Sequence, residues 1–165
     1  MTVIDVGPGA TDRVATGVSG YTLVDLNNPS SDDGSLDTME FWFSTMDGAG
    51  VKCGPFSGSG SSYTPRDYET IGSVVKGSKK TFTGLDCDVE TDDYLGVYFS
   101  GGLIEKTVYG YAGNYAKPGD QFGAGTQTYG SYPNDAISIY ATGTTGTAQP
   151  PMQNAIPAVM ALLMN

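Results

Sequence analysis

Acidic side chains are concentrated in two short stretches of this 165-residue chain, residues 31–37 and residues 86–93. In the second stretch Asp86, Asp88 and Glu90 recur at every second position, which puts them on one face of a strand. Paired carboxylates can hydrolyse glycosidic bonds, and loops rich in oxygen ligands can hold calcium. Exposed acids are ordinary on an acidic protein, however, and neither stretch has the spacing of an EF-hand loop. We therefore predict no catalytic residue and assign no metal ligand, while a structural calcium stays an open alternative.

Histidine is absent from the whole sequence. Its absence excludes the commonest general base and the commonest zinc ligand, together with every Ser-His-Asp or Cys-His catalytic arrangement. The glycine-rich stretches also lack the strand–glycine–helix context of dinucleotide-binding and phosphate-binding loops. We therefore expect a protein that is not an enzyme and that uses no cofactor.

The charge balance limits the kinds of partner. The chain has 18 acidic and 8 basic residues, a formal net charge of −10 and a pI of about 4.1. Phosphate groups repel such a surface, so we expect no nucleic-acid partner and no anionic membrane surface. No apolar run reaches the length of a membrane-spanning helix, and the first residues lack the regions of a signal peptide. We expect synthesis in a host cytoplasm.

The elements that must position these residues are short strands. The chain contains 24 glycines, its charged fraction is 16%, and no long helical pattern occurs before residue 150. This composition is typical of short strands joined by many turns, as in an antiparallel β-sandwich or barrel. Apolar side chains alternate along several stretches, and we predict that seven of them share one core: Phe41, Phe43, Leu95, Val97, Phe99, Ile137 and Ile139.

A tight turn is predicted at residues 91–93, in the middle of the fold. Residues 85–90 and 94–99 alternate between apolar and polar side chains, which is typical of half-buried strands. Residues 91–93 favour a turn because short Asp side chains can hydrogen-bond their own backbone. We therefore predict an antiparallel hairpin here. Residues 57–62 contain only Gly and Ser, and we expect a surface loop that cannot order itself.

Aromatic side chains are the candidate contacts for a partner or ligand. Trp42, the only tryptophan, is predicted on the strand face opposite the core, where it either packs under a neighbouring loop or stacks on a ligand. Residues 109–132 are rich in Tyr and Gly, and we predict exposed loops at one end of the sandwich, with ordinary loop packing as the alternative. Tyrosine suits such contacts because it offers a large area with few rotatable bonds. The candidate contacts for protein or glycan are Trp42, Tyr109, Tyr111, Tyr115 and Tyr129.

The two cysteines, Cys53 and Cys87, each fall on a predicted strand. Free cysteines are often buried as small apolar residues, and a reducing compartment disfavours disulfides. We expect both thiols to stay reduced, with a disulfide between adjacent strands as the alternative.

The C-terminal residues differ in character from the rest. We divide the chain into a β-domain (1–143), a flexible linker (144–151) and a short apolar tail (152–165). An exposed apolar tail is an aggregation liability, so we expect it to bury against another chain, as in a homo-oligomer such as a trimer, although folding back onto its own domain is the competing arrangement. Its expected assembly contacts are Ile156, Val159, Met160, Leu162, Leu163 and Met164.

Residues 85–98, with residues 77–82 before them, resemble a stretch of jelly-roll β-sandwich domains. In those domains an apolar strand, a Gly-Asp-Tyr turn and a Gly-Ile-Tyr strand recur; here Asp92 stands where Gly is usual. The resemblance covers roughly residues 20–142. Such domains occur in structural proteins of phages and virus-like particles and in carbohydrate-binding modules, so the resemblance implies a jelly-roll-like fold and transfers no functional residue.

These observations together predict a non-enzymatic structural protein of a virion-like assembly. Its expected role is that of a capsid decoration or cement protein on the virion surface, bound to neighbouring subunits and to its own copies. The alternative is a carbohydrate-binding domain of a tail fibre or an extracellular filament.

Overall fold

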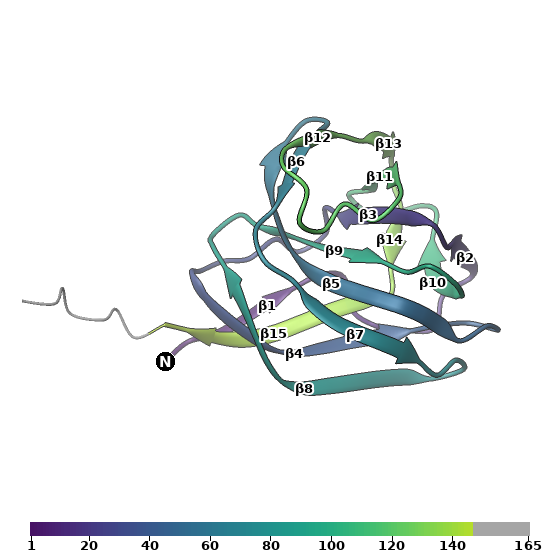
Figure 1. Cartoon of the computed structure of the whole chain (residues 1–165), viewed down its shortest axis with the longest axis horizontal. Coiled ribbons are helices and arrows are strands. Elements are labelled where there is room, and N and C mark those ends of the chain that lie inside the picture. The colour runs from purple at the N-terminus through teal and green to yellow at the C-terminus, as the bar shows by residue number, and fades with distance from the viewer. Residues whose placement is uncertain (147–165) are drawn as a thin grey trace, which may run out of the picture.

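The computed structural model describes residues 1–146, which form fifteen β-strands and no helix (Figure 1). The paired strands run antiparallel to one another, which confirms the all-β, antiparallel part of the prediction. Within this range no helix is long and apolar enough to cross a membrane. The expected tail, residues 152–165, and most of the expected linker lie outside the described residues.

Sheet A has four strands, which lie at the bottom of Figure 1. A register shift between Leu36 and Thr38 breaks the alternation of its longest central strand, so that Leu36 and Met39 both face the core. The last strand reaches Thr145 and pairs there with Gly34, so the first two residues of the expected linker belong to the sheet. In spatial order the strands are β1 (Val3–Val6), β15 (Ile139–Thr145), β4 (Gly34–Trp42) and β8 (Lys79–Val89).

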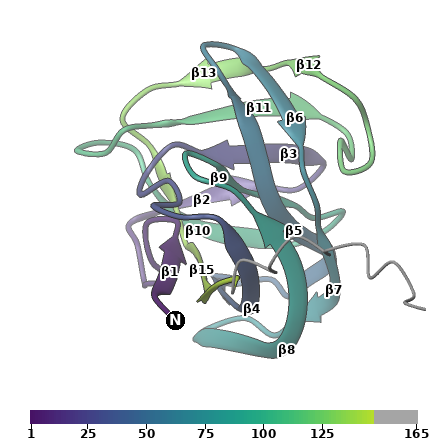
Figure 2. The same ribbon diagram turned by 90° about the vertical axis from the view of Figure 1, so that its left-hand side faces the viewer.

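Sheet C has eight strands and curls until its two edges come close (Figure 2). The edge strands β12 (Gln127–Thr128) and β13 (Gly130–Tyr132) are separated in sequence only by Tyr129, so the sheet forms a nearly closed, barrel-like layer. Its path is β12 (Gln127–Thr128), β6 (Ser62–Pro65), β5 (Gly48–Ser59), β9 (Tyr94–Tyr98), β3 (Tyr21–Asp25), β11 (Asn114–Pro118) and β13 (Gly130–Tyr132). The eighth strand, β7 (Glu69–Val74), pairs with β5.

Sheet B is smaller and lies beside the β3–β11–β13 part of sheet C. It consists of β14 (Ala136–Ile137), β10 (Leu103–Thr107) and β2 (Ala15–Val18). Gly17 faces the Ile104 side chain across the pair and leaves room for Leu23 of sheet C. Ile104 and Ile137 of this sheet are fully buried in the main core.

Two hydrophobic cores fill the molecule, one on each face of β3 and β9. The main core joins the sheets and contains all seven residues predicted to share it, which confirms that prediction. The second core lies inside the curl of sheet C and is mostly aromatic. Its buried members are Val24, Phe56, Tyr63, Phe122 and Tyr129.

The hairpin predicted around residues 91–93 is wrong. Strand β8 pairs with β4 in sheet A, whereas β9 lies between β3 and β5 in sheet C. The predicted turn itself is confirmed, and Asp92 has a positive φ of 67° that short Asp side chains tolerate. The alternating pattern shows only that β8 and β9 each have a buried face. It does not show that they pair, because two strands from different sheets can bury their apolar faces in the same core.

Two stretches expected as loops contain strands. Residues 57–62 form the β5–β6 hairpin, in which Ser59 pairs with Ser62 around a two-residue turn. The 109–132 stretch contains β11, β12 and β13 rather than exposed loops throughout. These stretches are ordered because their backbones hydrogen-bond to neighbouring strands, which their composition does not reveal.

Both cysteines are buried free thiols in the main core, as expected. Burial raises the pKa of the Cys53 thiol, and burial likewise raises that of Cys87. The protonated thiols behave as small apolar side chains.

Gly143 sits at the β15 register shift, where an added Cβ would collide with the Ser35 carbonyl oxygen of β4. We expect Gly143→Ala to lower the free energy of unfolding by about 1–3 kcal/mol, because the backbone cannot move aside without opening the sheet. The measurement is urea unfolding. Gly125→Ala is the control, since its Cβ would meet no atom; equal effects of the two changes would contradict the close packing.

Candidate functional site

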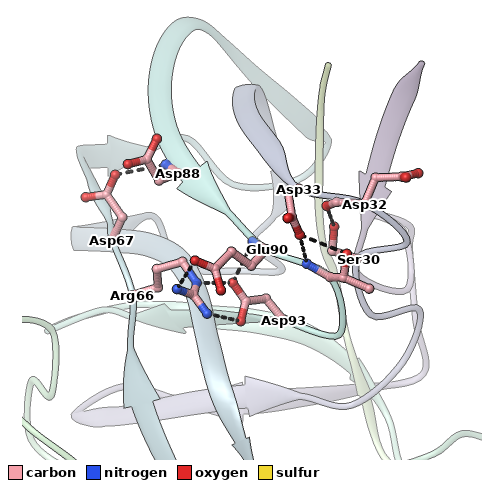
Figure 3. A network of polar contacts seen from close by, with 9 residues as sticks. Ser30, Asp32, Asp33, Arg66, Asp67, Asp88, Glu90 and Asp93 are labelled. Carbon is pink, nitrogen blue, oxygen red and sulfur yellow. Dashed lines mark hydrogen bonds and ion pairs between the residues drawn. The ribbon is translucent and has the colours of Figure 1, made fainter. Parts of the chain in front are cut away.

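The two acidic stretches seen in the sequence meet in the folded protein. Asp33, just before β4, accepts hydrogen bonds at Oδ1 from the Thr91 backbone N–H (2.7 Å) and the Thr91 hydroxyl (2.8 Å). These bonds, the backbone one first, hold the pKa of the exposed Asp33 carboxyl below its ordinary value. Figure 3 shows the two stretches beside Arg66, a residue that the sequence did not single out.

Arg66 follows β6 and binds the corner between β8 and β9 (Figure 3). Its Nε donates to Asp93 Oδ2 at 2.5 Å and its Nη2 to Asp93 Oδ1 at 3.1 Å, while Nη1 lies 2.8 Å from Glu90 Oε1. The Asp93 side chain is only 2% exposed, and its Oδ2 also accepts the Glu90 backbone N–H. A buried carboxylate needs such compensation, so Arg66 is what allows this corner to close.

Neighbouring carboxylates bind backbone N–H groups of β8. Asp67 Oδ2 accepts the Asp88 N–H at 2.9 Å, and Glu69 Oε1 accepts the Asp86 N–H at 3.0 Å. Side chains at and just before the start of β7 thereby tie sheet C to the β8 edge of sheet A. Within residues 1–146, no three His, Cys, Asp or Glu side chains are grouped so that they could hold a metal ion. The geometry favours a structural role for both acidic stretches.

The structure separates the aromatic residues proposed as contacts. Trp42 is half-buried at the end of β4, on sheet A. Tyr115 is half-buried against the second core, and Tyr129 is buried within it, so Tyr129 cannot meet an external ligand in this conformation. Tyr109 (65% exposed) and Tyr111 (41% exposed) follow β10 and do lie at the surface.

Exposed apolar side chains gather around β10. Lys106 pairs with Ala15, so Val14 and Val108 lie at the same end of the β2–β10 pair. The centre of the Tyr111 ring lies 5.0 Å from the guanidinium carbon of Arg13, and the centre of the Tyr132 ring lies 5.8 Å from Lys106 Nζ. We call this group the β10 surface; its exposed members are Val14, Val18, Val108, Tyr109, Tyr111 and Tyr132.

A pocket of about 140 Å³ opens between sheet B and sheet C; we call it the interlayer pocket. Strand register puts Leu23, Ala116 and Tyr132 on the face of sheet C that looks toward it. Sheet B contributes the facing wall with Gly17, Lys106 and Ile137. Its full lining is Gly17, Val18, Tyr21, Leu23, Lys106, Asn114, Ala116, Tyr132 and Ile137.

Two buried polar residues stand opposite each other next to this pocket, Asp25 on β3 and Asn114 on β11. Asp25 accepts three hydrogen bonds, two from Asn27 (2.8 and 2.7 Å) and one from the Ile137 backbone N–H (2.8 Å). Burial raises the pKa of Asp25 from 3.8 to about 7, although the bonds from Asn27 and Ile137 act in the opposite direction. Asp25 thus joins sheet C to β14.

Lys106, on the wall opposite Asn114, forms an ion pair within the protein. Its Nζ lies 2.8 Å from Oδ2 of Asp135, whose side chain is 8% exposed. The pocket therefore combines apolar walls, tyrosine rings and an amide with a paired lysine. Such a combination suits binding of a small ligand and provides no nucleophile with an adjacent base.

No family model matches the sequence, and no curated protein sequence matches it.

Sequence reasoning missed Arg66, Asn114 and Lys106. One signal was available for Arg66, which is one of only two arginines in an acidic chain. Its partner Asp93 could not be identified, because 27 residues separate them and only the fold brings them together. Asn114 and Lys106 lie on strands of different sheets, so their common pocket has no sequence pattern. The expected tail contacts lie outside the described residues.

Removing Arg66 leaves the Asp93 carboxylate buried without its partner. We expect Arg66→Ala to lower the free energy of unfolding by about 3–5 kcal/mol, as for other broken buried ion pairs. Arg66→Lys should cost less, because it keeps the charge and loses the two-pronged geometry. Urea unfolding measures both. The control is Glu90→Gln, whose 59% exposed side chain should be worth at most about 1 kcal/mol; an Arg66→Ala effect no larger than this would refute the role.

Asp25 predicts a pH dependence of stability. Its pKa rises on folding from 3.8 to about 7, so between these values the folded protein holds a proton that the unfolded chain releases. The stability that this bound proton contributes is fully present below about pH 3.8 and is lost as the pH rises toward 7. We expect the stability advantage of the wild type over Asp25→Asn to shrink between about pH 5 and about pH 8.

Urea unfolding at the two pH values tests this, with the exposed Asp12→Asn as the control. At every pH, Asp25→Asn should also lose about 1–3 kcal/mol, because the amide NH₂ cannot accept the Ile137 N–H. A wild-type advantage that stays the same at about pH 5 and about pH 8 would show that Asp25 is ionised in the folded protein.

Proposed function

We propose that this protein is a non-enzymatic structural protein of a virion-like assembly, acting as a capsid decoration or cement protein. In this proposal it sits on the virion surface as a homo-oligomer, a trimer being the expected form, and binds neighbouring capsid subunits. The proposal adopts the jelly-roll-like class from the sequence resemblance. The observation that carries it is the β10 surface.

The β10 surface supports a protein partner because six large apolar side chains are exposed on or beside strands β2 and β10. Large exposed apolar patches on monomers mark interaction sites, and tyrosine is enriched in such contacts. Strand β2 is also the edge of sheet B, and edge strands have unpaired backbone groups that another chain can bind. The apolar tail at residues 152–165 is the second proposed contact.

The alternative function is a carbohydrate-binding domain of a tail fibre or extracellular filament. The exposure of Tyr109 and Tyr111 favours it, because tyrosine rings can stack on sugar faces. In that case the protein would act outside the cell. Glycan-array binding that is lost in a Tyr109→Ala/Tyr111→Ala variant would support this alternative.

The assembly proposal predicts that both contacts are needed. We expect a Val108→Ser/Tyr109→Ser variant, and separately a chain lacking residues 150–165, to show a lower molecular mass by light scattering and weaker association with purified particles. Val75→Ser is the matched control, since Val75 is 59% exposed and lies outside the β10 surface. If both variants fold, keep the wild-type mass and bind particles normally, neither contact serves assembly.

A further inference from the structure

The interlayer pocket has room for one six-membered ring. Its volume is about 140 Å³, and an apolar cavity of about 150 Å³ holds a benzene molecule. Leu23, Ala116 and Ile137 supply apolar walls, and Tyr21 and Tyr132 supply rings. A flat or chair-shaped ring would contact apolar side chains from both sheets.

Asn114 gives the pocket a polar wall that the protein itself does not use. The residue is only 4% exposed, and among residues 1–146 the structure shows no hydrogen bond to its carboxamide. The carboxamide is also not sealed from solvent, since among the described side chains only the Tyr129 hydroxyl is both sealed and unbonded. Because Asn114 lines the pocket, the pocket is the open route to it.

The side-chain direction of Asn114 follows from strand register. Asn114 pairs with Asp25 on one side and with Tyr132 on the other, so the three side chains share one face of sheet C. Ala116, two residues along, lies on the same face and also lines the pocket. A carboxamide can donate two hydrogen bonds and accept others, which matches neighbouring hydroxyl groups on a ring.

Charge argues for an uncharged ligand. The one basic side chain in the lining, Lys106, is paired with Asp135, and no acidic side chain lines the pocket. An anion would have to break that pair and approach a protein with a net charge of −10. An apolar ring would cover the Asn114 carboxamide without giving it a partner, which costs about 1–3 kcal/mol.

We propose that the interlayer pocket binds one uncharged sugar ring, with hydroxyl groups hydrogen-bonded to the Asn114 carboxamide and an apolar ring face against the tyrosines. This site does not depend on the assembly role. It is also distinct from the exposed Tyr109 and Tyr111 rings of the carbohydrate-binding alternative, since neither residue lines the pocket.

The test is a titration of the isotope-labelled full chain, followed by NMR. The probes are the methyl glycosides of glucose, galactose, mannose and N-acetylglucosamine, with benzene as an apolar six-membered ring that has no hydroxyl groups. We expect at least one glycoside to shift the Asn114 side-chain NH₂ signals saturably and to bind more tightly than benzene. Asn114→Leu and Tyr132→Ala should each weaken that binding at least about fivefold, the size of one lost hydrogen bond or ring contact.

Tyr109→Ala is the matched control and should leave this binding unchanged. Because Tyr132 is half exposed, its variant keeps the test valid if Asn114→Leu does not fold. The proposal is overturned if no glycoside shifts the Asn114 signals, or if benzene binds more tightly than every glycoside. It is also overturned if Tyr109→Ala abolishes sugar binding while Tyr132→Ala does not.

Discussion

The ion pair between Arg66 and Asp93 is the interaction on which the layered arrangement depends. It lies where the chain leaves sheet A after β8 and enters sheet C at β9. Arg66 is itself fixed to sheet C, because its backbone N–H donates to the Pro55 carbonyl of β5. A carboxylate as buried as Asp93 would be costly alone, so the corner and the cation stabilise each other. One guanidinium thus joins the β6–β7 connection to the β8–β9 corner.

This corner explains how one sheet serves two cores. Because β8 and β9 separate, β9 can lie in the middle of sheet C with Leu95 and Val97 facing sheet A. The opposite face of the same sheet is then free to curl around the aromatic second core, which contains Phe56 and Tyr63. The main core covers only part of the first face. Beyond it, sheet C meets the small sheet B, and the interlayer pocket lies between them.

The two proposed binding regions share a strand and a ring. Strand β10 places Lys106 in the interlayer pocket and leads directly into Val108 and Tyr109 of the β10 surface. Tyr132 lines the pocket and is also an exposed member of that surface. A protein docked on the β10 surface and a ligand in the pocket would therefore both contact Tyr132. Strand pairing with β11 holds Asn114 and Tyr132 opposite each other, so the pocket is built on rigid elements.

The sequence by itself determined the all-β class and seven members of the main core. Period-two alternation identified Phe41, Phe43 and Ile139 as inward-facing, because side-chain direction along a strand is a local property. Only the tertiary structure decided which strands pair, and so turned the expected hairpin at residues 91–93 into a corner between sheets. It also decided the sites: Arg66 meets Asp93, and Asn114 meets Lys106 across a pocket, through strands distant in sequence. Such contacts depend on how the sheets stack, and the stacking of sheets leaves no repeating pattern in the sequence.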